Sequence, residues 1–403
     1  MNLMMRSKSK RLFLIIVFWL GIIFLYNGCN PSLIKDKQSE IDSLATKWVP
    51  DKREGICSVT LITKGKKSIL LRGETTIPQA KYDIIKALSK PGIILIDSIL
   101  ILPDTLKNNK YQGLVTLSVI NLRKLPDHRS ELVSQAILGT PVLILKKENS
   151  WFLIQTPDKY IAWTESSSVQ LMSAAEMNVW KKCDRVIYTE NSGWIYNSAD
   201  QKGVVGDIVS GSILKKGKES NGYSQVFLPD GREGFILNTK LTDFLSWKTE
   251  INCTEENVCN CSMKLLGLPY LWGGSSSKAV DCSGFVHLVY FLNGIILSRD
   301  ASLQALHGFP VNISDKYEEM RKGDLLFFGS KDNLGLHVTH VAIYLGNKEY
   351  ININSSGRVM INSLDSTRAN YIDYRETSLL AAKRIIGINN DPGIVPVGKH
   401  PWY

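Results

Sequence analysis

Few features of this chain point to a fold held together by disulfides or metal. Seven cysteines occur in 403 residues, and their spacing matches no disulfide framework, which a chain of this length does not need. Cys259 and Cys261 stand one residue apart, but no second pair follows at the spacing of a zinc site. We therefore expect no metal and no cofactor, and we place both cysteines on a helix that leads to Leu265.

The chain also lacks a long basic tract. Its net charge of +10 arises from 48 Lys and Arg against 38 Asp and Glu, and outside the first residues this surplus is spread along the chain. No recognisable nucleic-acid motif accompanies it, which argues against nucleic acid as a partner. A mildly positive surface suits an acidic polymer or an anionic envelope.

The N-terminus has an apolar run, Leu12–Tyr26, that is too short for a comfortable membrane span. Cationic residues precede it, so residues 1–28 predict a secretion signal. The Gly28-Cys29 pair resembles a bacterial lipobox, which implies a lipidated Cys29 and a bacterial envelope protein, facing the periplasm or on the outer membrane. Tyr26 and Asn27 depart from the small or aliphatic residues usual there. An uncleaved anchor and ordinary cleavage with a free cysteine are therefore alternatives.

Changes in residue pattern divide the rest of the chain. Residues 29–50 are polar and predict a flexible tether. Residues 51–115 predict an α/β segment of unknown role, with a helix from Pro78 to Ser89. Beyond it, short runs with turn residues between them predict two small antiparallel barrels, over residues 116–175 and 176–250.

The two expected barrels share a pattern. Trp151–Asp158 and Tyr223–Asp230 each run through a strand into a Pro-Asp turn, which indicates an internal repeat. Both units resemble bacterial SH3-like domains, and two generic β-modules without a ligand are the alternative. The strands expected in the first are Val115–Leu122, Pro141–Leu145, Trp151–Gln155 and Tyr160–Thr164, and those in the second are Val186–Thr189, Ser212–Lys215, Tyr223–Leu228 and Gly234–Leu237.

Residues 251–390 predict an α+β domain, because helical runs precede a series of strands. The apolar run Phe285–Leu292 follows a glycine pair, so Cys282 falls in the first turn of a helix. Unpaired N–H groups and the helix dipole there favour negative charge, and we expect a lowered thiol pKa and a nucleophilic thiolate. The expected strands are Asp324–Phe328, His340–Leu345, Tyr350–Asn354 and Val359–Ser363.

A cysteine nucleophile needs a base and a group that orients it. Among six histidines, His340 is the best candidate because it begins a strand, whereas His337 has the opposite parity and His287 lies on another face of the cysteine helix. A half-buried histidine bonded to backbone is the alternative. Across the hairpin, Asn352 or Asn354 could accept the second ring N–H.

Several short motifs together resemble the NlpC-type cysteine peptidases of bacterial cell walls, over residues 255–388. They are Leu268–Gly274, Val280–Phe285, Arg299–Ser302, Arg321–Leu325 and Thr339–Gly346. With SH3-like units before them, they resemble the subgroup that cuts γ-D-glutamyl-diamino acid bonds in peptidoglycan peptides.

The resemblance implies a papain-like fold for the last domain, with Cys282 as nucleophile and His340 as base. The family's third polar residue is usually histidine, and here asparagine replaces it. We prefer Asn352 to Asn354 because hairpin pairing constrains geometry more than a loop does.

The same resemblance implies substrate contacts. It assigns Asp281 and Ser283 to the substrate's free N-terminal amine, Tyr270 and Trp272 to the cleft with the Tyr270 hydroxyl assisting the oxyanion, and Ser302 to the substrate. It also implies that the first SH3-like domain closes one end of the cleft. For this contribution we choose Glu131 and Tyr160, and the alternative is that they are a surface acid and a strand aromatic.

The expected activity is hydrolysis of stem peptides, mainly short ones with a free L-alanine amine. An inactive wall-binding lipoprotein, or an amidase or transpeptidase using the same Cys-His pair, is the alternative. Diaminopimelate or lysine at the diamino acid position stays open, as does the oligomeric state, for which a monomer is the expectation.

Overall fold

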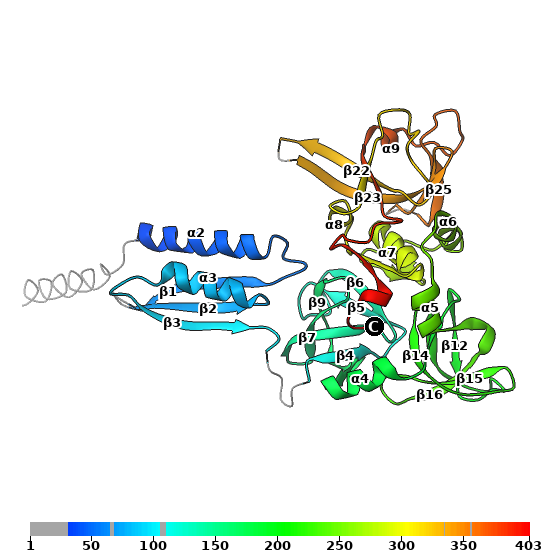
Figure 1. Ribbon diagram of the computed structural model, residues 1–403, viewed down its shortest axis with the longest axis horizontal. Helices are drawn as coiled ribbons and strands as arrows, with labels where there is room; N and C mark the ends of the chain where they lie inside the picture. The colour runs from blue at the N-terminus through cyan, green and yellow to red at the C-terminus, as the bar shows by residue number, and fades with distance from the viewer. Residues whose placement is uncertain (1–30, 65–67, 105–109, 334, 355–356) are drawn as a thin grey trace, which may run out of the picture. The chain divides into compact units, whose positions relative to one another are not determined.

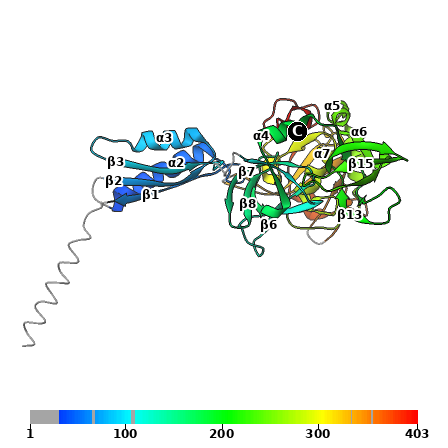
Figure 2. The same ribbon diagram turned by 90° about the horizontal axis from the view of Figure 1, so that it is seen from below.

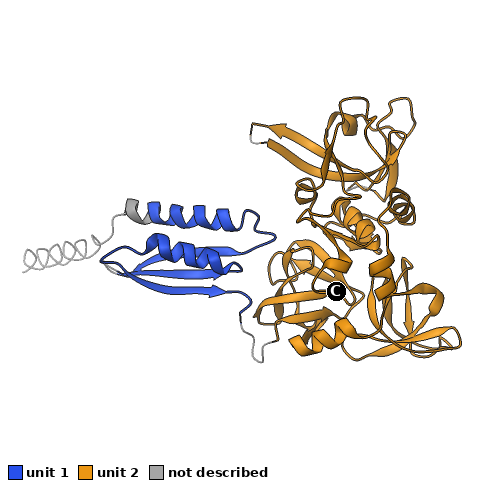
Figure 3. Ribbon diagram, in the orientation of Figure 1, with its two compact units in different colours: residues 1–104 blue, residues 105–403 orange. Residues whose placement is uncertain are grey.

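The computed structural model describes residues 31–64, 68–104, 110–333, 335–354 and 357–403. The expected signal over residues 1–28 and the expected lipidation site, Cys29, lie outside this part. The chain divides into two compact units, residues 1–104 and 105–403 (Figure 3). No helix in the described part of the chain has both the length and the apolar character that a membrane crossing requires.

The first unit is a small α/β layer structure (Figure 1). Its sheet has the order β1-β2-β3, with β2 antiparallel to β1 and parallel to β3. Two helices pack together on one face of this sheet, and Ile41, Leu71 and Ile84 lie in the core between the layers. The elements are α2 (Pro31–Trp48), β1 (Cys57–Lys64), β2 (Ser68–Thr75), α3 (Pro78–Leu88) and β3 (Ile94–Ile101).

The flexible tether expected over residues 29–50 is wrong, because α2 occupies Pro31–Trp48. Ile41 is only 1% exposed in the core. The Gln38 side chain donates to Val59 O at 3.0 Å and accepts from Leu61 N at 2.9 Å, so it binds strand β1. The polar composition of the segment concealed a narrow apolar stripe that is buried on the sheet.

The second unit begins with a barrel whose seven strands have the order β10-β4-β7-β8-β9-β5-β6. The single strand expected over Val115–Leu122 is two strands, separated by a bend at residues 116–118. Strand β6 was not predicted, because its apolar residues come in pairs rather than in alternation. The strands are β4 (Gln112–Val115), β5 (Val119–Arg123), β6 (Leu132–Ile137), β7 (Pro141–Glu148), β8 (Trp151–Gln155), β9 (Ile161–Glu165) and β10 (Val169–Met172).

A second barrel follows, with the strand order β13-β12-β16-β15-β14-β11-β17. Helix α4 (Ala174–Lys182) joins the barrels, and α5 (Phe244–Glu250) leaves the second one. Its strands are β11 (Arg185–Tyr188), β12 (Ser192–Tyr196), β13 (Val204–Val209), β14 (Ile213–Ser220), β15 (Tyr223–Phe227), β16 (Glu233–Leu237) and β17 (Leu241–Asp243).

The last domain packs helices against a six-stranded sheet of order β21-β26-β22-β23-β24-β25. Helix α7 lies on one face, where Phe285 and Val289 share a core with Phe327, Val341 and Ile343. Its strands are β21 (Phe309–Val311), β22 (Leu325–Asp332), β23 (Gly335–Gly346), β24 (Glu349–Asn352), β25 (Met360–Ser363) and β26 (Leu379–Arg384), and its helices are α6 (Glu255–Met263), α7 (Cys282–Leu292), α8 (Ala301–Gln304) and α9 (Asp373–Thr377).

Two short pairs complete the domain: β18 (Ser275–Ser276) with β19 (Ala279–Val280), and β20 (Ile295–Leu297) with β27 (Ile394–Pro396). The chain after β27 lies beside α4 and α5 (Figure 2). The Tyr403 ring lies 6.2 Å from the rings of Phe244 and Phe291. This C-terminal segment therefore packs both on the second barrel and on helix α7.

Gly139 provides a test of the packing between the barrels. Its φ is +80°, and an added Cβ would lie 2.0 Å from Ile213 O in the second barrel. Gly231 has a similar φ of +88° but no atom within 4 Å of such a Cβ. Alanine at either position costs about 1–2 kcal/mol of backbone strain. We expect Gly139→Ala to lower the free energy of unfolding by roughly 1–3 kcal/mol more than Gly231→Ala, measured by urea denaturation. Equal losses would contradict this packing.

Candidate active site

Cys282 is the first residue of α7, and the chain before it fixes where that helix begins. Asp281 is the N-cap residue, and its Oδ1 accepts from Gly284 N at 2.7 Å. A Cβ on Gly284 would lie 2.0 Å from Gly274 O, so the helix start and the preceding glycine turn approach at backbone distance. The sequence prediction of Cys282 in the first helical turn is confirmed.

The Cys282 sulfur lies beside strand β23. The backbone N–H groups of Val341 and Ser283 hydrogen-bond to it and favour the thiolate. Val341 directly follows His340, and the pairing of β23 with β24 ends at Ile343. The thiol therefore lies near the point where β24 diverges from β23, next to the residue that carries the imidazole.

His340 is 5% exposed, and its Nε2 lies 3.1 Å from Asn352 Oδ1. The two residues come from β23 and β24, and the Phe328 ring on β22 is 5.6 Å from the imidazole. Of the two asparagines considered from sequence, Asn352 thus holds the ring nitrogen, and Asn354 lies beyond the end of β24.

A chain of amides fixes the orientation of Asn352. Its Nδ2 donates to Asn362 Oδ1 at 2.8 Å, and Asn362 Nδ2 donates to the backbone carbonyl of Asn370 at 3.3 Å. A carbonyl can only accept, so the Oδ1 of Asn352 must face His340. Nε2 of His340 therefore carries the proton, and Nδ1 has the free lone pair that a base requires. Sequence reasoning did not identify Asn362.

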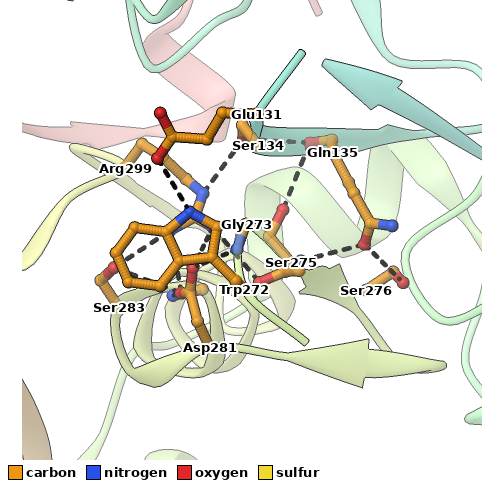
Figure 4. A network of polar contacts seen from close by, with 12 residues as sticks. Glu131, Ser134, Gln135, Trp272, Gly273, Ser275, Ser276, Asp281, Ser283 and Arg299 are labelled. Atoms are coloured by element: carbon orange, nitrogen blue, oxygen red, sulfur yellow. Dashed lines mark hydrogen bonds and ion pairs between the residues drawn. The ribbon is translucent and has the colours of Figure 1, made fainter. Parts of the chain in front are cut away.

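A buried ion pair between Arg299 and Asp281 lies at the start of α7 (Figure 4). Arg299, 1% exposed, donates from Nη1 and Nη2 to the two oxygens of Asp281 at 3.0 and 2.7 Å. Its Nε donates to Ser134 Oγ of the first barrel at 3.0 Å, and Nη1 also reaches Ser283 Oγ at 3.0 Å. Asp281 further accepts from Gly273 N at 2.9 Å. One guanidinium therefore joins the first barrel to the beginning of helix α7.

These contacts bear on the expected amine site at Asp281 and Ser283. Both side chains are buried, and Arg299 already matches the carboxylate charge. Direct contact of these two residues with a substrate amine stays a prediction. In the free protein they hold the start of helix α7.

Burial has the largest effect on the pKa values of Cys282 and His340. Burial and the nearby Asp281 raise the pKa of Cys282 to about 11, which outweighs the N–H groups of Val341 and Ser283. Burial and the charge of Arg375 lower the pKa of His340 to about 3. The expectation of a lowered thiol pKa is therefore wrong for the free protein. At neutral pH a neutral thiol lies beside the strand of a neutral imidazole.

The residues expected to line the cleft come from two domains. Burial, with Asp281 and Cys282 nearby, raises the pKa of Tyr270 to about 12, so its hydroxyl remains a donor near the thiol. Trp272 is 61% exposed, and its Nε1 donates to Glu131 Oε1 of the first barrel at 3.1 Å. Lys124 Nζ lies 3.4 Å from Glu131 Oε2. Glu131 therefore reaches the catalytic domain, as Figure 4 shows.

The remaining candidates lie at different depths. Tyr160 is buried and close enough to Arg299 to raise the pKa of that guanidinium further. Ser302 is half-buried in α8. Gln135 of β6 was not predicted, although its Oε1 accepts from Ser275 N at 3.1 Å and from Ser276 Oγ at 3.2 Å. Gln135 adds a second contact between the barrel and the glycine turn before Cys282.

Other histidines and cysteines lie apart from this arrangement. His287 Nε2 is 3.4 Å from Asp158 Oδ2, and His337 Nε2 is 2.8 Å from Asp332 Oδ2. Cys259 and Cys261 lie on α6. Within the described residues, no group of His, Cys, Asp and Glu side chains could hold a metal ion.

The fold and this site define a papain-like cysteine peptidase domain preceded by two SH3-like barrels. Residues 267–376 match the NlpC/P60 family, and residues 122–169 match the bacterial dipeptidyl-peptidase Sh3 domain. The chain belongs to the NlpC/P60 family of cysteine peptidases. It is 31% identical to dipeptidyl-peptidase 6 of Lysinibacillus sphaericus over 277 residues, which cover 67% of this chain and 97% of that protein.

A further relative and a solved structure are also similar to this chain. A γ-D-glutamyl-L-lysine dipeptidyl-peptidase of Bacillus cereus is 29% identical over 230 residues, 55% of this chain and 67% of that one. A solved structure of an NlpC/P60 family protein from Bacillus cereus superposes with a TM-score of 0.59 at 23% identity, over 68% of this chain and 99% of that one. This structural similarity supports the fold.

Asn362→Leu tests the amide chain. Without its acceptor, the Asn352 amide can rotate and present Nδ2 to the ring, so the tautomer protonated at Nδ1 should become populated. We would measure the ¹⁵N chemical shifts of the two His340 ring nitrogens by NMR. In Asn370→Ala the backbone carbonyl is retained, and we expect the wild-type tautomer. An unchanged His340 tautomer in Asn362→Leu would contradict the role of this chain.

The pKa of Cys282 predicts how its reactivity depends on pH. Because a neutral thiol predominates below pH 11, we expect its alkylation by iodoacetamide to accelerate about tenfold per pH unit from pH 7 to 10. Mass spectrometry of the peptide containing Cys282 separates it from the other cysteines. A rate that is already constant near pH 7 would instead indicate a thiolate–imidazolium pair.

Proposed function

We propose that this protein hydrolyses the bond between D-glutamate and the diamino acid in peptidoglycan stem peptides, mainly short peptides with a free N-terminal L-alanine. The main support is the sulfur of Cys282 at the N–H of Val341, next to a His340 whose tautomer Asn352 fixes. The name of the Bacillus cereus relative, a γ-D-glutamyl-L-lysine dipeptidyl-peptidase, supports the class of substrate.

In the proposed first step, the Cys282 sulfur attacks the γ-carbonyl carbon while Nδ1 of His340 takes the thiol proton. A carbon–sulfur bond forms, and the carbonyl oxygen becomes an oxyanion. N–H groups at the start of α7 and the Tyr270 hydroxyl can donate to it, because burial keeps that hydroxyl protonated. The oxyanion then collapses, the carbon–nitrogen bond breaks, and the imidazolium protonates the departing amine.

In the second step, water attacks the thioester and His340 takes its proton. The carbon–sulfur bond breaks, and the thiol regains a proton as the γ-carboxylate of D-glutamate leaves. Asn352 keeps Nε2 as the donor throughout, so Nδ1 is available for both transfers.

The free amine of the substrate requires an anionic partner at the closed end of the cleft. We assign this role to Glu131, because Arg299 already matches the charge of Asp281. Glu131 is partly exposed and held by Trp272, and its second oxygen faces Lys124. An ammonium group would compete with Lys124 for that oxygen.

We also propose that the protein is anchored to the bacterial envelope by lipid on Cys29, facing the periplasm or on the outer membrane. The Gly28-Cys29 pair at the end of a short apolar run supports this. Anchoring would keep the enzyme close to the peptides released from the wall.

A peptide assay tests the proposed activity. We expect the wild-type protein to convert L-Ala-γ-D-Glu-L-Lys to L-Ala-D-Glu and lysine, followed by mass spectrometry, and the N-acetylated peptide to react at least about tenfold more slowly because an ion pair is lost. Cys282→Ala should abolish turnover, whereas Cys259→Ala, on α6, should retain it. Binding without turnover would favour an inactive wall-binding protein, and ligated products a transpeptidase.

A further inference from the structure

Arg375 has no counter-ion among the residues that the structure describes. Its side chain is half-buried on α9, and it forms neither an ion pair nor a side-chain hydrogen bond with any residue in the described part of the chain. Its guanidinium carbon instead lies 5.4 Å from the centre of the Phe328 ring and 4.9 Å from that of Tyr374. Three of the five other arginines of the domain have carboxylate partners: Arg299 with Asp281, Arg368 with Glu349 and Arg384 with Asp324.

This unpaired charge lies close to the base. Phe328 is paired with His340 across β22 and β23, and its ring contacts both the imidazole and the guanidinium. The positive charge disfavours a protonated imidazole. The proposed mechanism nevertheless requires His340 to become an imidazolium while it holds the thiol proton. An anion that pairs with Arg375 in the substrate complex would remove this penalty.

The substrate itself can supply this anion. His340 protonates the departing amine, and that amine is bonded to the α-carbon of the diamino acid. A free carboxylate on the same carbon lies within a few bonds of the imidazole. Arg is well suited to bind it, because its planar guanidinium can form two parallel hydrogen bonds to a carboxylate.

We propose that Arg375 forms a carboxylate subsite for the α-carboxylate of the leaving diamino acid. This inference rests on the proposed function. It makes Arg375 a specificity residue that selects peptides ending at the diamino acid over peptides in which this carboxyl is bonded to a further residue. Binding at the subsite also favours the imidazolium, so the correct substrate assists its own cleavage.

Two peptides that differ in one group test the subsite: L-Ala-γ-D-Glu-L-Lys and its L-lysinamide analogue. We expect wild-type kcat/KM to be about 10- to 100-fold higher for the carboxylate. Arg375→Gln should bring the two values of kcat/KM close together. It lowers the value for the carboxylate, which loses its partner, and raises the value for the amide, because the unpaired charge no longer disfavours the imidazolium. Arg375→Lys should retain part of the preference. Arg368→Gln removes the same charge from a residue paired with Glu349 and should behave as wild type.

Binding to the inactive Cys282→Ala protein gives a readout without turnover. By calorimetry, the carboxylate peptide should bind more tightly than the amide, and adding Arg375→Gln should abolish the difference. Equal loss for both peptides in Arg375→Gln, or no loss for either, would overturn the subsite. A further peptide replaces D-glutamate by D-isoglutamine, which lacks the α-carboxylate. If Arg375→Gln removes a preference for the D-glutamate α-carboxylate instead, the ligand of Arg375 lies on the other side of the cleaved bond, and the proposed subsite is also overturned. If the wild-type protein cleaves neither peptide, the proposed function itself fails.

Discussion

The ion pair between Arg299 and Asp281 is the contact on which the rest of the site depends. Asp281 caps α7. Arg299 donates hydrogen bonds to both carboxylate oxygens of Asp281 and to Ser134 of the first barrel. Both charges are buried, and removing one partner of such a pair typically costs roughly 3–5 kcal/mol. The position of Cys282 and the position of the barrel that brings Glu131 to Trp272 are therefore set by the same guanidinium.

Burial and the charges around Cys282 favour a neutral resting state. Burial, and then Asp281, raises the pKa of the Cys282 thiol, and burial, and then Arg375, lowers that of His340. Each effect opposes the thiolate–imidazolium pair that attack requires. Such a site is protected from alkylation and oxidation when empty, because the thiolate is the reactive form. A substrate whose carboxylate pairs with Arg375 favours the imidazolium form of His340 only while it is bound.

Much of the site could be predicted because its signals are local in sequence. A glycine pair and an apolar run are sufficient to place Cys282 at a helix start, and the pairing expected across the hairpin is sufficient to bring Asn352 to His340. The direction of the thiol pKa could not be predicted, because burial depends on packing with the sheet. Asn362 could not be predicted either, since its contact with Asn352 depends on how β25 pairs with β24.

Parts of the fold were missed for related physical reasons. Helix α2 is polar in composition, and only its packing on β1 reveals the buried stripe. Strand β6 lacks regular alternation because it supplies Ser134 and Gln135 to contacts with the catalytic domain. Residues that serve an interface between domains do not follow the pattern of a single barrel, so the contacts that close the site are those that periodicity cannot detect.

Asparagine in place of the usual third histidine has a consequence of its own. A histidine at this position would itself titrate, and its protonated form could not accept from the ring of the base. Asn352 has no such transition, and Asn362 together with the carbonyl of Asn370 fixes which end of its amide faces His340. The orientation of the base is therefore independent of pH. The pH dependence of the site is left to the thiol, the imidazole and the charges that surround them.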